Sequence, residues 1–204
     1  NSQQDIYQEL EMQYIEPELR EGLKEVDLAR ENKIPTLIEL KDLKGILHNH
    51  TTYSDGVHTL KQMADYCKSL GYEYLGICDH SKTAVYAQGL SVEKGIEQQQ
   101  EIDKLNLSYQ NFRILKGIES DILNDGSLDY PDEILRSFDF IVASIHSNLK
   151  MNEEKATERL ITAIENPYTT ILGHPTGRLL LARKGYPINH KKIIDACAAN
   201  KVSI

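Results

Sequence analysis

The sequence has 204 residues, of which 40% are apolar and 26% are charged, a composition typical of a globular protein with one sizeable core. Its formal net charge of -8 argues against a protein that coats nucleic acid through its overall field, although local phosphate contacts stay open. Apolar runs are only a few residues long, far short of the roughly 20 that cross a bilayer, and the polar N-terminal segment is unlike a signal peptide. We therefore expect a soluble, cytoplasmic protein without membrane contact.

The first 43 residues differ in character from the rest. Ile6, Tyr7, Leu10 and Tyr14 stand at helical spacing among polar residues, which predicts a short amphipathic helix within residues 2–14. The charged stretch 22–35 that follows looks like a linker. We therefore predict an N-terminal segment over 1–43 and a domain over 44–204.

Within the domain, short apolar runs alternate with helical patterns. The helical patterns cover Thr59 to Gly71, about 91–107, about 152–165 and 189–201. This alternation predicts a parallel sheet of α/β class, either open or closed into a barrel. A sixth apolar run begins at the last residues, and a parallel barrel needs at least one more strand to close, so we expect an incomplete barrel within this chain. The five apolar runs are 45–50, 74–80, 112–119, 138–146 and 169–174.

Every apolar run ends in a residue type that binds metals. Because the carboxyl ends of parallel strands meet at one edge of the sheet, these side chains should converge there. A single histidine after an apolar run is usually a buried, hydrogen-bonded residue, but here five of the seven histidines occupy such positions. His58 and His190 stand apart and receive no role. The residues at the run ends are His48, His50, His80, Glu119, His146 and His174.

Three carboxylates complete this pattern. Asp55 follows the His48-Asn49-His50 pair in a loop where Gly56 permits a tight turn back toward the imidazoles. Glu119 is the obvious bridging carboxylate, whereas Asp79 should point to the opposite strand face and support the site or cap a helix. Nitrogen and oxygen ligands without thiolate suit manganese, zinc or iron. Several such ions would activate a bridging water for attack on phosphorus.

The cysteines and the basic residues have simpler readings. Cys67, Cys78 and Cys197 stand singly in apolar patterns without a CxxC pair, which indicates reduced core residues. The stretch 166–194 contains no Asp or Glu, and is either an ordinary solvated surface or a rim that faces phosphate. Its basic residues are Arg178, Arg183, Lys184, Lys191 and Lys192.

The segments LHNHTTYSDG, CDHS, GIES, SIHS and GHPTGR resemble, in order, the motifs of the PHP (polymerase and histidinol phosphatase) family. The resemblance spans about residues 44–204 and is greatest to the C-terminal domain of bacterial family X DNA polymerases. YIEPELREG is similar to their connector between polymerase and PHP domain, and CDHSKTAVYAQGLS to their second-strand loop. The resemblance implies a distorted seven-stranded β/α barrel that holds up to three divalent metal ions in a cleft.

The resemblance also implies roles for particular residues. His48, His50 and Glu119 would bind one ion, Glu119, His146 and His174 a second, and Asp55 and His80 a third. Of these, His48, His50, Glu119 and His146 would carry the catalysis. The family's Asp-x-His pair from a last strand does not follow His174 here, which leaves two ions one ligand short. Arg178 and Lys82, the latter in the loop that runs to Gly89, are the expected substrate contacts.

The implied activity is a metal-dependent 3′ to 5′ exonuclease that acts on DNA 3′ ends in a repair polymerase, with the polymerase module N-terminal to this chain. Nucleotidyl transfer itself is excluded here because the sequence has no Asp-x-Asp pair for Mg²⁺. One alternative is a small-molecule phosphatase of the histidinol phosphatase type, which acts on a phosphomonoester. Another is a metal-binding scaffold without catalysis, and an amidohydrolase is disfavoured because its late Asp is not found.

Overall fold

The computed structural model describes residues 2–204, and the chain divides into two compact units, Asn1–Leu43 and Lys44–Ile204. Among the described residues no helix combines the length and the apolar character that crossing a bilayer requires. The larger unit carries the predicted site. That the smaller unit is a connector stays a prediction.

The smaller unit contains more regular structure than its sequence indicated. Helix α1 spans Gln3–Glu9 and ends before the predicted residue 14, because Glu11 takes a positive φ of 52°. The stretch predicted to be a linker instead contains helix α2, Glu25–Arg30, flanked by single 3-10 turns at Pro17–Leu19 and Leu40–Asp42. Ile15 and Ala29 are buried inside this unit, so the segment has a small core of its own.

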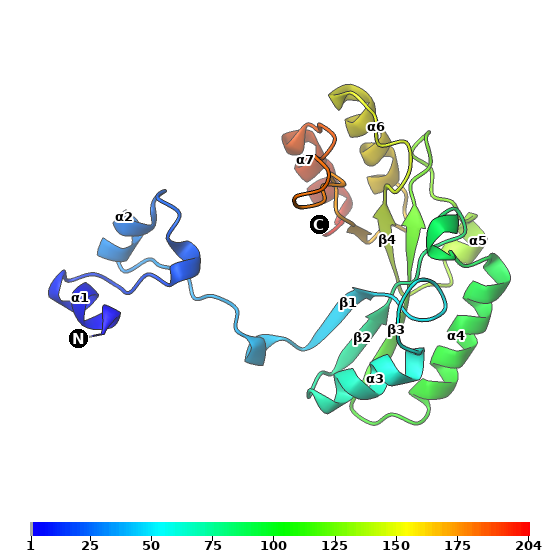
Figure 1. Ribbon diagram of the computed structural model, residues 1–204, viewed down its shortest axis with the longest axis horizontal. Coiled ribbons are helices and arrows are strands. Elements are labelled where there is room, and N and C mark those ends of the chain that lie inside the picture. Colours follow the sequence, from blue (N-terminus) through cyan, green and yellow to red (C-terminus); the bar gives the residue numbers. More distant parts are fainter. Residues whose placement is uncertain (1) are drawn as a thin grey trace. The chain divides into compact units, whose positions relative to one another are not determined.

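The larger unit is built on a parallel five-stranded sheet in the order β1-β2-β3-β4-β5 (Figure 1). The predicted α/β class, an incompletely closed barrel, is confirmed: the strands curl into half a barrel. Ser203 pairs in parallel with Ile171, so the sixth apolar run starts alongside β5. The strands are β1 Gly45–Asn49, β2 Tyr74–Ile77, β3 Arg113–Asp121, β4 Phe140–Ser144 and β5 Ile171–Leu172.

Helices connect successive strands. The four predicted helices are present, whereas a short helix at Asp132–Leu135, between β3 and β4, was not predicted. Thr59 caps α3 through a capping box with Gln62, and Gly71, at a φ of 83°, follows its C-terminal end. Besides these helices, one 3-10 turn, Val85–Ala87, follows β2. The helices are α3 Leu60–Ser69, α4 Val92–Asn106, α5 Asp132–Leu135, α6 Glu153–Ile164 and α7 His190–Asn200.

Two apolar clusters cover the outer face of the sheet. One joins α3 and α4 to β2 and β3 through residues such as Leu60, Leu75 and Ile102, and the other joins α6 and α7 to β3 and β4 (Figure 1). The cysteines lie in these clusters and in a third, and all three are buried and free, as predicted. The helices thus anchor the sheet from outside and leave its inner face to the site.

On the inner face of the sheet, the ring of Phe140 packs against two glycines, Gly76 and Gly117. A Cβ on Gly117 would lie 2.3 Å from Phe140 Cζ, and one on Gly76 would lie 2.8 Å from the same atom. Phe140, Cys78 and Val142 form the third apolar cluster, below the carboxyl ends of the strands. Two strands without side chains at these positions let the ring pack directly on their backbone.

This packing predicts that Gly117→Ala lowers the free energy of unfolding by about 1–3 kcal/mol, because the added methyl group overpacks the ring. The matched substitution Gly95→Ala, in α4, should raise it by about 0.5–1 kcal/mol, since the nearest atom to its Cβ is 3.7 Å away. Urea unfolding measures both values, provided that the slope of the free energy of unfolding against urea concentration is the same in each variant. Equal effects of the two substitutions would contradict the packing argument.

Candidate metal centre

The site is built around Glu119, which lies on the central strand β3 and is 1% exposed. Strand alternation places Gly117, Glu119 and Asp121 on one face, so the carboxylate continues the inner face above Phe140. The neighbouring strands lead His80 and His146 to the same end of the sheet, and the two edge strands lead His48 and His174 there. The structure therefore brings every predicted run-end residue to one place.

A β-bulge in β1 orients the histidine pair. Ile46 pairs with Leu75 but Asn49 pairs with Ile77, so β1 contains one residue more than β2 over this interval. His48 takes a φ of 60°, a left-handed conformation that is uncommon for a side-chain-bearing residue. Leu47 reaches Gly76 on the inner face, and the bulge turns the next residue, His48, to that same face. Strained backbone of this kind is typical of functional sites.

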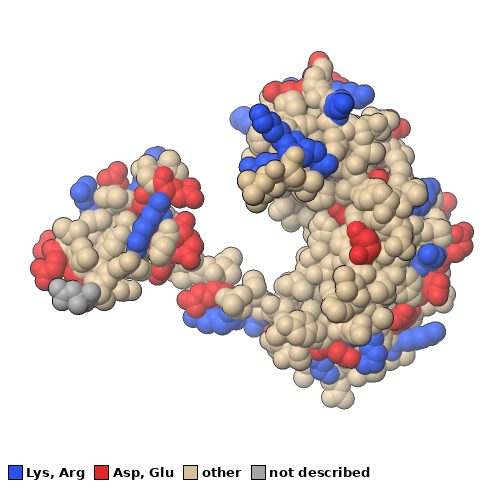
Figure 2. All heavy atoms as spheres, viewed as in Figure 1, with Lys and Arg blue, Asp and Glu red and all other residues tan. Residues whose placement is uncertain are grey.

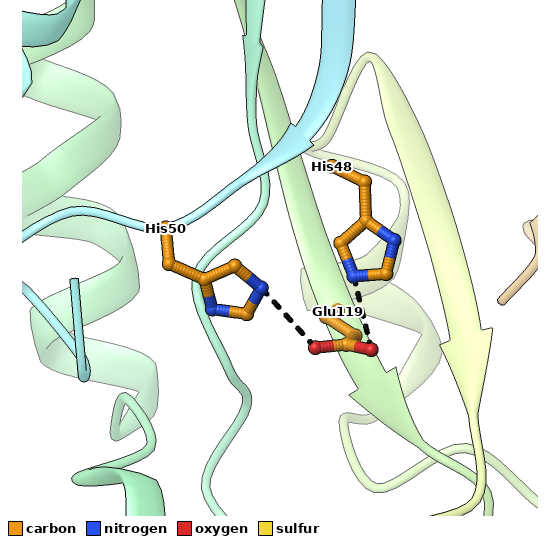
Figure 3. Close-up of side chains that lie close together, drawn as sticks. All are labelled: His48, His50 and Glu119. Atoms are coloured by element: carbon orange, nitrogen blue, oxygen red, sulfur yellow. Dashed lines mark ion pairs between the residues drawn. The ribbon is translucent and has the colours of Figure 1, made fainter. Parts of the chain in front are cut away.

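Three imidazoles approach one oxygen of Glu119. The Nε2 atoms of His48 and His174 lie 3.0 Å from Oε1, and Nε2 of His146 lies 3.3 Å from it. Figure 3 shows His48 and His50 reaching the two different carboxylate oxygens from the same strand end. Because His48 and His174 come from opposite edges of the sheet, this convergence requires the sheet to curl.

The other oxygen of Glu119 faces a second group. Nδ1 of His80 lies 3.1 Å and Nε2 of His50 lies 3.5 Å from Oε2. The outer nitrogens of these two rings face Asp55, at 3.2 Å for His50 and 3.6 Å for His80. Glu119 and Asp55 therefore bracket the two rings, and Gly56 allows the turn that brings Asp55 back, as predicted: its Cβ position lies 2.4 Å from the His50 carbonyl oxygen.

Three sets of ligand-type atoms lie close enough to hold an ion. The ligand atoms in each set lie within 4.8 Å of one another. The predicted grouping of His48, His50 and Glu119 is one of these sets, whereas the pair Asp55 and His80 gains His50. In the third set His80 joins Glu119 and His146. The predicted grouping of Glu119, His146 and His174 stays a prediction: His174 is in none of the three sets, but its Nε2 and that of His146 face the same oxygen of Glu119. The sets are His48-His50-Glu119, His50-Asp55-His80 and His80-Glu119-His146.

The donor set fits divalent metal ions. Glu119, Asp55 and Asp121 have only imidazoles as ion-pair partners within the described chain, so no lysine or arginine there pairs with them directly. His50 Nδ1 and His80 Nδ1 are buried and form no hydrogen bond, although carboxylate oxygens lie near them. Buried imidazole nitrogens facing carboxylates in this way are what ligation by a shared cation would satisfy.

The pKa values of the site follow from burial and from the imidazoles. Burial by itself would raise the pKa of Glu119, but hydrogen bonds from His146, His174 and His48 more than offset it and lower that pKa. Burial would lower the pKa of His146, yet Asp121 and Glu119 raise it to about 9. Burial dominates at His80 and lowers its pKa, which favours the neutral ring that metal ligation needs.

Asp121 is a site residue that the sequence reading missed. It is 2% exposed and its carboxylate contacts His146 Nδ1, while His146 Nε2 faces Glu119. A carboxylate on the outer nitrogen fixes the orientation and tautomer of a ligating histidine. Its position two residues after Glu119, on the same face of a strand, is a signal that could have found it.

Asp79 supports the site rather than joining it, as predicted. This fully buried carboxylate accepts hydrogen bonds from Thr51 N and Oγ1, both at 2.7 Å, and from Ser54 Oγ at 2.5 Å. Gln98 of α4 donates to it at 2.6 Å. These bonds fasten the loop that carries Asp55 to β2 and α4.

The two predicted substrate contacts lie in different environments. Arg178 lines a cavity of about 500 Å³ together with His146 and His174. Lys82 is exposed and lines neither this cavity nor the larger one beside it, among the residues that the structure describes. From the Lys82 loop, Tyr86 lines the smaller cavity instead, with its ring centroid 6.0 Å from that of His80 and 6.1 Å from that of His146.

Comparison with known proteins agrees with this geometry. The family model of the PHP domain matches residues 47–199. The chain is 43% identical over 194 residues to the Bacillus subtilis protein "DNA polymerase/3′-5′ exonuclease PolX", covering 95% of this chain and 34% of that one. It is 30% identical over 157 residues to a "probable phosphatase" of Acetivibrio thermocellus, covering 75% of this chain and 60% of the relative.

A solved structure shares the fold. It is histidinol phosphate phosphatase from Lactococcus lactis, complexed with zinc, L-histidinol and phosphate. The TM-score is 0.53 and the sequence identity 16%, and the match covers 78% of this chain and 71% of that one. Fold and side-chain set together define an α/β half-barrel domain with groups of residues that could hold metal ions. The chain belongs to the PHP domain family, which confirms the resemblance seen in the five motifs. It spans about a third of the length of its polymerase relative.

The central position of Glu119 predicts that Glu119→Gln weakens metal binding by more than the roughly 10–100-fold typical of losing an outer-shell partner. Bound Mn²⁺ or Zn²⁺, counted by elemental analysis after dialysis, should fall, and the rise in melting temperature on adding metal should disappear. Glu165→Gln, at an exposed position, is the control. Unchanged metal content in Glu119→Gln would refute the assignment.

The Asp79 network predicts that Asp79→Asn destabilises the larger unit by on the order of 2 kcal/mol, because an amide NH₂ group would face donors of Thr51, Ser54 or Gln98. Asp103→Asn breaks only an exposed pair with Lys116 and should cost less than about 1 kcal/mol. Denaturant unfolding compares the two variants. A smaller effect at Asp79 than at Asp103 would show that the network is not structural.

Proposed function

We propose that this chain is the phosphoesterase domain of a DNA polymerase of family X type and removes nucleotides from DNA 3′ ends with divalent metal ions. The observation that carries the proposal is the convergence of five imidazoles on Glu119 at the carboxyl edge of the sheet. The identity to the Bacillus subtilis polymerase/exonuclease over 95% of this chain supports the choice of substrate. A polymerase module would then stand N-terminal to this chain in the parent protein.

The arrangement suits hydrolysis of a phosphoester. Metal ions bound at these residues would supply an activated water near neutral pH and hold phosphate oxygens. His48, His50, Glu119 and His146 would provide the ligands nearest the reacting phosphate. Asp55, His80 and His174 would complete the set, with Asp121 holding His146 in place. Manganese, zinc or iron would each suit this mixture of nitrogen and oxygen ligands.

A phosphomonoesterase is the second candidate. The probable phosphatase relative and the fold shared with a histidinol phosphate phosphatase favour it. The same ligands serve either ester, so the distinction depends on what surrounds the metals. Arg178 at the rim of the smaller cavity is suited to a substrate anion in both cases.

The test is a comparison of two substrates. We expect the chain with Mn²⁺ to shorten a 5′-fluorescein single-stranded DNA from its 3′ end, giving a ladder of products, and to release little phosphate from histidinol phosphate. Glu119→Gln should abolish the ladder. Exclusive turnover of histidinol phosphate would overturn the exonuclease proposal in favour of the phosphatase. Binding of at most one metal ion, with neither ester hydrolysed, would favour the scaffold without catalysis.

A further inference from the structure

A second, larger cavity opens beside the metal centre and carries a distinct set of charges. Its volume is about 860 Å³, within the roughly 300–1,000 Å³ range of ligand sites. It shares His146, Gly177 and Arg183 with the smaller cavity that contains His174. A ligand whose reacting group lies at His146 can therefore extend into it.

The lining of this cavity is cationic. Lys150, Lys155, Arg183 and Lys184 line it, and no carboxylate does so. None of the four forms an ion pair with a carboxylate within residues 2–204, whereas Lys191 on α7 pairs with Asp195 at 2.6 Å. In Figure 2, lysine and arginine side chains gather over the part of the larger unit that contains α6 and α7. The local field is positive despite the net charge of -8.

Two arginines position the walls of the cavity. Arg183 donates through Nε and Nη2 to the Gly177 carbonyl, at 3.0 and 2.8 Å, which closes the loop between them. Arg159 is 3% exposed and donates to the carbonyls of Leu123 and Ser147, which ties the segments on either side of the cavity together, while its charge faces the nearby carboxylates of Asp121 and Asp125.

One polar group in the lining lacks a partner. Tyr186 is 7% exposed, and its hydroxyl is buried without a hydrogen bond within the described chain. Burial raises the pKa of Tyr186 to about 12, so the hydroxyl is a donor at neutral pH. A buried, unpaired donor among cations indicates an anionic ligand.

Building on the proposed function, we propose that this cavity binds backbone phosphates of the DNA strand beyond the reacting linkage, through Lys150, Lys155, Arg183, Lys184 and the Tyr186 hydroxyl. A monoester has a single phosphate and gains nothing from such a site. A polynucleotide places one phosphate at the metal centre and the next ones among these cations. The cavity would thus favour polynucleotide ends over small phosphate esters.

The test measures binding, so that it does not depend on hydrolysis. Fluorescence anisotropy with 5′-fluorescein thymidine oligonucleotides of two, four and eight residues is recorded in Ca²⁺ over a range of salt, and unlabelled thymidine monophosphate is measured as a competitor. The whole chain is compared with the double variants K155Q/K184Q and K191Q/K192Q. The second variant removes the same charge from α7, outside both cavities.

We expect affinity of the unaltered chain to rise with oligonucleotide length. K155Q/K184Q should weaken octamer binding at least 10-fold and reduce the salt slope by about 1.4, the value for two lost contacts with single-stranded DNA, while leaving the monophosphate nearly unaffected. K191Q/K192Q should leave the slope unchanged. Equal loss in the two double variants would overturn the proposal.

Other outcomes separate this inference from the proposed function. If K155Q/K184Q weakens the monophosphate as much as the octamer, the cavity is a small-phosphate site and the strand path is wrong. If octamer binding depends on Lys155 and Lys184 but Mn²⁺ supports no shortening of DNA, the inference stands and the exonuclease proposal fails. If DNA is shortened without that dependence, the exonuclease stands and the inference fails.

Discussion

The buried carboxylate of Glu119 is the interaction on which the rest of this structure depends. A carboxylate that is 1% exposed is costly unless it is compensated, and imidazoles at the ends of the other four strands provide the contacts. For His48 and His174 to meet there, the two edges of a five-stranded sheet must approach each other. Three features allow the edges to come together: the curl of the sheet, the bulge at His48 and the glycines beside Phe140.

Around this centre, buried carboxylates hold the loops that follow the strands. Asp79 fastens the loop after β1, and Asp129 accepts hydrogen bonds from Ser81 at 2.7 Å and from Thr83 N and Oγ1 at 3.0 and 2.8 Å, which fastens the loop after β2. Both are satisfied by neutral donors rather than by cations. Their negative charges stay close to the imidazoles, where they favour bound cations, and the loops that carry ligands become rigid.

The charges of the larger unit are divided in space. Carboxylates and imidazoles form the centre, while three lysines and Arg183, none of them ion-paired within residues 2–204, line the cavity that starts at His146. Under the proposed function, metal ions at the centre would hold the reacting phosphate and the neighbouring cations would attract further phosphates. Selectivity between a monoester and a polynucleotide would then depend on the second region rather than on the ligands. Such a division would let one family fold serve substrates of different size.

The sequence alone determined the parallel α/β class, the capping of α3 by Thr59 and the seven candidate ligands. Strand and helix periodicities and capping residues are local properties, so they can be recognised without the tertiary structure. It also indicated the supporting role of Asp79, since alternation along a strand decides which face a side chain takes. Only the tertiary structure decided the rest. The bulge at His48, the contact of Asp121 with His146, and the gathering of Lys150 and Lys155 with Arg183 around one cavity depend on how distant strands curl together, which no local pattern records.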